Sequence, residues 1–185
     1  MLNENNKMRF ESIDYLENGS ELQKEAYKVL TKNEVMEKLV IFQPILVGTI
    51  PLDIAIKDSD LDIVCSFENK QVFKEEIQKH FTNYSEFSVV EKIFQDEPTV
   101  IVRFVLDNFP VEIFAQSMPS NQQIAFQHML IEHEVLTDRG EEFTKEVIRL
   151  KESSIKTEPA FAQLLNLKGD PYLALLEYGV NQKII

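Results

Sequence analysis

Apolar residues recur at helical spacing in the first part of the chain and again through its last third, with short apolar runs between these two parts. Ser20 precedes the first helical pattern as a favourable N-cap. The patterns predict helices over residues 20–39, 69–81, 121–136 and 141–152, and two more whose N-caps are Thr157 and Asp170. Gly169 is expected to end the helix that starts at Thr157.

The apolar runs between the helical patterns are short and rich in β-branched and aromatic residues, which is typical of strands. They predict strands over residues 42–47, 60–67, 87–94, 99–106 and 111–115. Asp107-Asn108 has turn chemistry between the last two runs, so we expect an antiparallel hairpin there. The order of elements predicts an α+β fold, with a core over residues 1–118 and a helical region over 119–185 packed on it.

The composition fits one compact domain of 185 residues, 44% of them hydrophobic. No apolar run is long enough to span a membrane, and the polar N-terminus lacks the apolar stretch of a signal peptide. Cys65 is the single cysteine, so no intramolecular disulfide can form. We therefore expect a cytoplasmic protein in which Cys65 is a small buried hydrophobe.

The formal charge of −12 argues against binding to a long nucleic acid. Such binders carry a basic patch that follows the phosphate backbone, whereas the Lys and Arg residues here are scattered. A small nucleotide bound with its metal ion remains compatible with an acidic surface, because the ion neutralises both partners locally.

Asp60 and Asp62 stand two positions apart within an apolar run. On a strand they project from the same face, while Leu61 and Ile63 turn toward the core. Two neighbouring carboxylates repel each other unless a cation lies between them. Mg²⁺, or Mn²⁺ in its place, is the expected ion because it prefers hard oxygen ligands and leaves positions for substrate phosphates.

Glu112 is a third acid, placed in the middle of the apolar run over residues 110–114. If this run pairs with the strand beside Asp62, the three carboxylates converge on one patch of the sheet and suit phosphoryl or nucleotidyl transfer. Gly48-Thr49 follows another apolar run and supplies a complementary group. Glycine allows backbone N–H groups to approach a phosphate closely, and the Thr49 hydroxyl adds a hydrogen bond.

Together these residues resemble the DNA polymerase beta-like nucleotidyltransferase superfamily. Its pattern is a hydrophobic residue followed by Gly-Ser or Gly-Gly, a spacer of about the length seen here, Asp-x-Asp between hydrophobic residues, and a third acid on a later strand. The helical last third, with Thr157-Glu158-Pro159 and Gly169-Asp170-Pro171, is similar to an uncharacterised bacterial family placed in this superfamily. That closer likeness implies no substrate.

The resemblance implies a nucleotidyltransferase-like core in which Asp60, Asp62 and Glu112 are both the metal ligands and the catalytic residues. The candidate phosphate-binding residues are Gly48, Thr49, Lys57, Ser59 and Arg103. Three features depart from the pattern: Thr49 replaces the usual serine or glycine, Lys57 is the only cation between Gly48 and Asp60, and the third acid is Glu112 rather than aspartate.

The remaining polar candidates keep alternative interpretations. His128 and His133 are five residues apart and face different sides of a helix, which argues against a zinc site. His128 and Glu132 share a face and suit a structural or substrate-orienting hydrogen bond. Arg103 is expected on the same face as Glu112 if a two-residue loop forms at residues 108–109, where it pairs with that acid or contacts a phosphate. Lys151 and Lys156, near the start of a C-terminal helix, are weaker candidates for contact with a nucleotide phosphate.

The leading hypothesis is a metal-dependent nucleotidyltransferase that moves a nucleoside monophosphate from an NTP to a hydroxyl of an unidentified small-molecule or protein acceptor. One alternative is an inactive nucleotidyltransferase-like domain that binds a nucleotide or a protein partner. The other is a metal-dependent phosphohydrolase, in which water replaces the acceptor hydroxyl.

Overall fold

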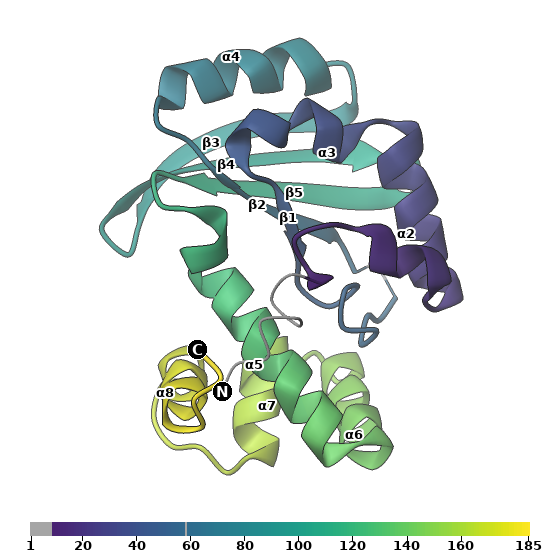
Figure 1. Ribbon diagram of the computed structural model, residues 1–185, viewed down its shortest axis with the longest axis vertical. Coiled ribbons are helices and arrows are strands. Elements are labelled where there is room, and N and C mark those ends of the chain that lie inside the picture. Colours follow the sequence, from purple (N-terminus) through teal and green to yellow (C-terminus); the bar gives the residue numbers. More distant parts are fainter. Residues whose placement is uncertain (1–8, 58) are drawn as a thin grey trace.

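A five-stranded mixed sheet forms the centre of the computed structural model, which describes residues 9–57 and 59–185 (Figure 1). The strands are β1 (Ile45–Val47), β2 (Leu61–Ser66), β3 (Ser85–Phe94), β4 (Glu97–Leu106) and β5 (Phe109–Gln116). They lie in the order β1-β2-β5-β4-β3. All pairs are antiparallel except β2 and β5, which run parallel. The α+β fold expected from the sequence is confirmed.

The described helices fall into two groups along the chain. The first group is η1 (Asp14–Asn18), α2 (Glu21–Lys32), α3 (Val35–Lys38), η2 (Val40–Phe42) and α4 (Lys70–Phe81). The second group is η3 (Ser120–Gln122), α5 (Ile124–Arg139), α6 (Glu141–Glu152), α7 (Thr157–Leu164) and α8 (Pro171–Asn181). None of the helices in the described residues is long and apolar enough to cross a membrane.

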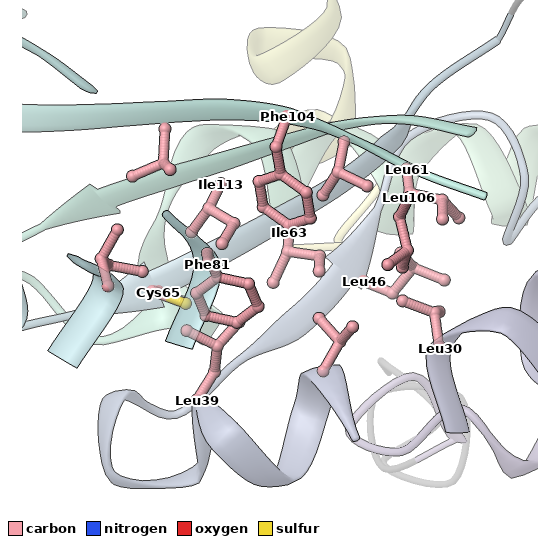
Figure 2. Close-up of a cluster of buried hydrophobic side chains, with 14 of the residues drawn as sticks. Leu30, Leu39, Leu46, Leu61, Ile63, Cys65, Phe81, Phe104, Leu106 and Ile113 are labelled. Atoms are coloured by element: carbon pink, nitrogen blue, oxygen red, sulfur yellow. The ribbon is translucent and has the colours of Figure 1, made fainter. Parts of the chain in front are cut away.

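One face of the sheet packs against α2, α3 and α4 in a fully apolar core (Figure 2). Leu61, Ile63 and Cys65 of β2 point into this core and are at most 1% exposed. Ile113 of β5 and Phe104 of β4 join them from neighbouring strands. The expectation that Cys65 is a buried hydrophobe is therefore confirmed, and burial raises the pKa of its thiol.

The other face of the sheet meets the C-terminal helices. Val47 of β1 and Val64 of β2 pack with Phe126 and Met129 of α5 in a second apolar cluster. Figure 1 shows α5 running away from the sheet, with α6, α7 and α8 gathered around it. This arrangement covers β1 and β2 but leaves Glu112 and Phe114 of β5 lining a cavity rather than packed in either apolar cluster.

Several predicted helix boundaries differ from the structure. The helix expected over residues 20–39 breaks after α2, because Glu34 adopts a left-handed conformation with φ 53°. Ser20 caps α2 as expected, in a capping box with Gln23. Thr157 is not an N-cap: Lys156 holds that position without a side-chain hydrogen bond.

Of the other two predicted helix ends, one differs from the structure and one is confirmed. Gly169 does not end α7, whose C-cap is Leu165. Asp170 caps α8 as expected, because its side chain accepts hydrogen bonds from the backbone N–H groups of Tyr172 and Leu173.

Candidate functional site

A cavity of about 650 Å³ lies between the second face of the sheet and the C-terminal helices. Residues from the β1–β2 connection, from β5 and from the helical region α5–α7 line it. Seven of the eight residues proposed from the sequence are among its lining: Gly48, Thr49, Lys57, Ser59, Asp60, Asp62 and Glu112. The eighth, Arg103, contacts the site through Glu112.

The parallel pairing of β2 and β5 brings two of the acids together. Asp62 and Glu112 are directly opposed partners in the register of these strands. Since their neighbours Ile63 and Ile113 are buried on the opposite face, both carboxylates point into the cavity. Asp60 lies immediately before β2 and also lines the cavity. The three acids proposed from the sequence therefore share one side of the sheet.

Gly48 lies directly against the Asp62 carboxylate. Its φ of +83° is in the left-handed region that favours glycine, and a Cβ built at this position would lie 2.6 Å from Asp62 Oδ2. A side chain here would displace the carboxylate. The glycine that follows β1 thus leaves room for the Asp62 carboxylate.

Two hydroxyls stand in the connection between β1 and β2. The Ser59 hydroxyl accepts a hydrogen bond from the backbone N–H of Ile56 at 3.0 Å, and the Thr49 hydroxyl approaches it at 3.5 Å. The backbone carbonyl of Thr49 accepts from the N–H of Ile54. These bonds hold Thr49 and Ser59 at the rim of the cavity, beside the exposed side chain of Lys57.

The pKa of Asp62 is raised to about 8. Burial is the main cause, and the negative charges of Asp60, Glu112 and Glu158 add to it, opposed by the positive charge of Lys151. An acid with this pKa is largely protonated at pH 7 unless a cation compensates the charge. A cation bound beside Asp62 would therefore stabilise the charged form of this carboxyl group.

The donor set has the chemistry of a Mg²⁺ site, because carboxylate oxygens are the ligands this ion prefers. The side chains are not arranged in advance: among the described residues, no three acidic, histidine or cysteine side chains form a ready metal-binding group. Glu112 is engaged by Arg103, whose Nη2 lies 2.5 Å from Glu112 Oε2. Ion binding would require the carboxylates to move together.

Arg103 opposes Glu112 directly across β4 and β5. Leu106 pairs with Phe109, so Asp107 and Asn108 form the two-residue turn. The turn chemistry noted in the sequence is thus confirmed, and the loop assumed at residues 108–109 is off by one residue. The two side chains nevertheless share a face, because moving the loop by one residue shifts each cross-strand pair by two positions, and a strand repeats its faces every two residues.

A second group of polar residues, which the sequence did not include among the eight proposed site residues, enters the cavity from the helices. Its members are His128 and Glu132 from α5, Lys151 from α6 and Glu158 from α7. We call these four residues the helical polar cluster. The signal for Glu132 and Lys151 was present in the sequence, because both occupy positions that the helical period assigns to the buried face.

The helical polar cluster is electrostatically linked to the acids on the sheet. Burial lowers the pKa of Lys151 to about 8, against the opposing effect of Glu132, Glu158, Asp60 and Asp62. The Lys151 ammonium donates a hydrogen bond to the carbonyl of Ile54 at 2.6 Å. This bond ties α6 to the β1–β2 connection, so Lys151 stands between the two acidic groups.

The polar contacts of His128 follow from its position on α5. Its Nε2 lies 3.0 Å from the carbonyl oxygen of Tyr172, and its Nδ1 lies 3.6 Å from Glu158 Oε1. His128 thus makes a structural hydrogen bond to Tyr172 of α8 and lies near Glu158 of α7, rather than contacting Glu132. His133 instead packs edge-on against Phe10, outside the lining of the cavity.

Comparison with solved structures places the fold. A mutant of the Cid1 poly(U) polymerase bound to MgATP matches with a TM-score of 0.53 and 11% identity over 85% of this chain and 49% of that chain. The same polymerase bound to MgGTP gives a TM-score of 0.50 and 14% identity over 69% of this chain and 41% of that chain. The chain thus spans less than half of these solved chains. At such identities the similarity shows the nucleotidyltransferase-like fold alone.

Sequence comparison gives the family. No curated protein sequence matches the chain significantly. The profile of a family described as "Domain of unknown function (DUF4269)" matches residues 28–178, which include β1 to β5, the cavity and the C-terminal helices. The chain therefore belongs to the DUF4269 family.

Proposed function

We propose that this protein is a metal-dependent nucleotidyltransferase that moves a nucleoside monophosphate from an NTP to an acceptor hydroxyl. The observation that carries the proposal is the pairing of Asp62 with Glu112 on the cavity side of the sheet, with Gly48 against the Asp62 carboxylate. Proteins of the same fold are described with MgATP and MgGTP bound, which supports a metal–nucleotide ligand here.

Asp60, Asp62 and Glu112 are the residues we propose to hold Mg²⁺. The bound ion would orient the phosphates and neutralise the charge that develops on them. Ion binding would also relieve the mutual repulsion that raises the pKa of Asp62. The chain's own contribution is to place these carboxylates side by side on rigid strands.

The phosphates would lie along the turn that begins at Gly48. Backbone N–H groups of this turn and the hydroxyls of Thr49 and Ser59 supply donors. Lys57 and Lys156 are exposed cations at the rim, and Lys151 is a buried cation deeper in the cavity. Together they offset part of the charge of a triphosphate.

In the proposed reaction the acceptor oxygen attacks the α-phosphorus in line with the leaving group. A new P–O bond forms, the bond between the α-phosphorus and the bridging oxygen breaks, and pyrophosphate departs with the electron pair. The acceptor's proton passes to a carboxylate of the site, for which Glu112 is the proposed base, and then to water. The acceptor is a small molecule or a protein side chain; a long nucleic acid does not suit the acidic surface.

Calorimetric titration of the full chain with each Mg–NTP tests the metal site. The isosteric variant Asp62→Asn should bind Mg–NTP at least about tenfold more weakly than wild type, since it loses a charged ligand. Asp53→Asn is the matched control: it removes an exposed acid at a φ of 56°, which asparagine tolerates, and should bind normally. Equal affinity in all three proteins would rule out the metal assignment.

The ion pair between Arg103 and Glu112 favours a second candidate, a domain that binds a nucleotide without turning it over. Incubation with α-labelled NTP and a panel of acceptors separates the two. Labelled acceptor together with released pyrophosphate supports transfer, whereas tight binding without either product supports the inactive domain. Released nucleoside monophosphate without labelled acceptor would instead indicate a phosphohydrolase.

A further inference from the structure

The cavity carries more negative charge than a metal–nucleotide complex accounts for. Among the described residues that line it, six are acidic and three are lysines. Only Asp60, Asp62 and Glu112 are used by the proposed metal site. A metal–triphosphate complex is itself anionic, so it does not compensate the remaining acids. The excess must be balanced by another ligand or by protons.

Glu132 is the most deeply buried of the three remaining acids. It lies on α5, lines the cavity and is 3% exposed. No hydrogen bond or ion pair reaches its carboxylate from the described residues, although Lys151 and Glu158 are near enough to affect its pKa. A buried carboxylate without a partner is costly, and a ligand that donates hydrogen bonds removes that cost.

The neighbours of Glu132 offer acceptors too. A carbonyl oxygen cannot donate, so the contact with Tyr172 requires His128 Nε2 to carry the proton. In the neutral ring Nδ1 is then an acceptor, and it lies 3.6 Å from the Glu158 carboxylate. An ammonium that approaches from the cavity side could donate to both atoms through two of its N–H groups.

Lys151, the lysine whose charge acts on Glu132, is held by a backbone carbonyl. The Lys151 ammonium donates to the Ile54 carbonyl at 2.6 Å, and it forms no ion pair with an acid among the described residues. The other two N–H groups of Lys151 make no ion pair with these acids, so Glu132, Glu158 and His128 Nδ1 present acceptors that a ligand with several N–H donors would complement. A positively charged amine satisfies both the donor count and the charge.

We propose that the helical polar cluster binds the acceptor substrate through an ammonium group held by Glu132 and Glu158, so that the acceptor is a cationic, amine-bearing alcohol. The identification of this ligand as the acceptor substrate rests on the proposed function. The binding of an amine at the cluster is independent of that function, because the cluster lies on α5, α6 and α7 rather than on the strands that carry the proposed metal ligands.

Calorimetric titration with spermidine, a flexible tricationic probe, tests this site without nucleotide or metal, in about 0.15 M salt so that distant surface charges are screened. The wild-type chain should bind spermidine saturably. Glu132→Gln should weaken the affinity about tenfold or more, since glutamine cannot release a proton to become the charged partner of a bound ammonium. Glu177→Gln is the matched control: it removes an exposed helical acid and should bind as wild type.

Triacetylspermidine, which has the same skeleton without charge, should bind at least tenfold more weakly than spermidine. Equal binding of the two probes would overturn the proposal in favour of a neutral ligand. Equal spermidine affinity in wild type and Glu132→Gln would overturn it as well, because the attraction would then arise from the general acidic surface.

Folding of the variant is checked by thermal unfolding. Burial raises the pKa of Glu132 well above its usual range, and glutamine resembles the protonated acid, so Glu132→Gln should remain folded. Glu158→Gln, at a less buried position, provides a second variant with the same expected loss of spermidine affinity. If spermidine binds as expected but no Mg–NTP binds to wild type, the amine site stands and the nucleotidyltransferase proposal fails.

Discussion

The two faces of the strand pair β2 and β5 are built on opposite principles. One face presents Leu61, Ile63 and Ile113 to an apolar core in which each is at most 1% exposed (Figure 2). The other presents Asp62 and Glu112, whose charges repel. Because side chains alternate along a strand, the same two strands carry apolar residues that stabilise the fold on one face and acids that destabilise it on the other.

This contrast indicates where the protein accepts an energetic cost. A burial pattern that served stability alone would place apolar residues at positions 62 and 112, as it does at their neighbours 61 and 113. The acidic face is stable only because the apolar face holds the strands in register. Removing an apolar side chain from the first face should therefore lower stability, whereas neutralising an acid on the second face should raise it.

Phe104→Ala should have the largest effect. Phe104 is 2% exposed and stacks on Phe81 and Tyr84 at ring-centroid distances of 5.1 and 5.2 Å. Its loss should cost about 3–5 kcal/mol of unfolding free energy, measured by denaturant unfolding. Phe94→Ala, at a 38% exposed residue lining the cavity, should cost only about 1 kcal/mol. Similar losses at both positions would contradict the contrast between the faces.

Asp62→Asn should instead stabilise the protein in the absence of metal. Because the pKa of Asp62 is raised from 3.8 to about 8, the folded state holds more protons than the unfolded state between these values. Stability from this group is therefore present at low pH and is lost as the pH rises toward 8. At pH 8 the variant should gain roughly 2–4 kcal/mol, and its stability should fall less steeply with pH. Saturating Mg²⁺ should reduce the difference in unfolding free energy between the variant and wild type.

Gly48→Ala tests the contact between the turn and the acid. The substitution should cost about 2–3 kcal/mol, from the left-handed backbone and from the clash with Asp62 Oδ2. Gly140→Ala is a close control, because Gly140 has a φ of +74° and nothing within 4 Å of the added Cβ. The difference between the two variants isolates the contact. Equal losses would show that Gly48 serves the turn alone.

Arg103→Gln should have the smallest effect on stability, below about 1 kcal/mol, because the Arg103 side chain is 53% exposed in its ion pair with Glu112. Its effect on ligands should be larger. Freeing Glu112 should raise Mg²⁺ affinity several-fold if this acid is a ligand. Lys74→Gln breaks an exposed pair with Glu91 and should leave Mg²⁺ binding unchanged. Unchanged Mg²⁺ affinity in Arg103→Gln would argue that Glu112 is not a ligand.

Local patterns were sufficient to predict much of the fold. The alternation around Asp62 and Glu112 placed both acids on one face, and the helix predicted over residues 141–152 matches α6. Patterns failed where a neighbouring element decides the backbone. The break at Glu34 contains neither glycine nor proline; it places Val35 in the core, which the helical period alone does not require.

The candidate site was predictable only on its sheet side. Strand alternation links Asp62 to Glu112, because a period of two needs no knowledge of the helices. Glu132 and Lys151 fall on buried helical positions, and the helical period alone does not show that both enter the cavity together with Glu158. Their environment is set by the way α5, α6 and α7 meet over the cavity, which depends on contacts distant in the chain.

The parallel pairing of β2 and β5 also has a consequence for synthesis. Position 62 leaves the ribosome well before position 112, and parallel strands require a long crossover, here α4, β3 and β4. Loop closure of this length is slow compared with local helix formation. A nascent chain therefore carries Asp60 and Asp62 before the partner strand with Glu112 has been made. The three acids of the proposed site can thus come together only after β5 has been synthesised.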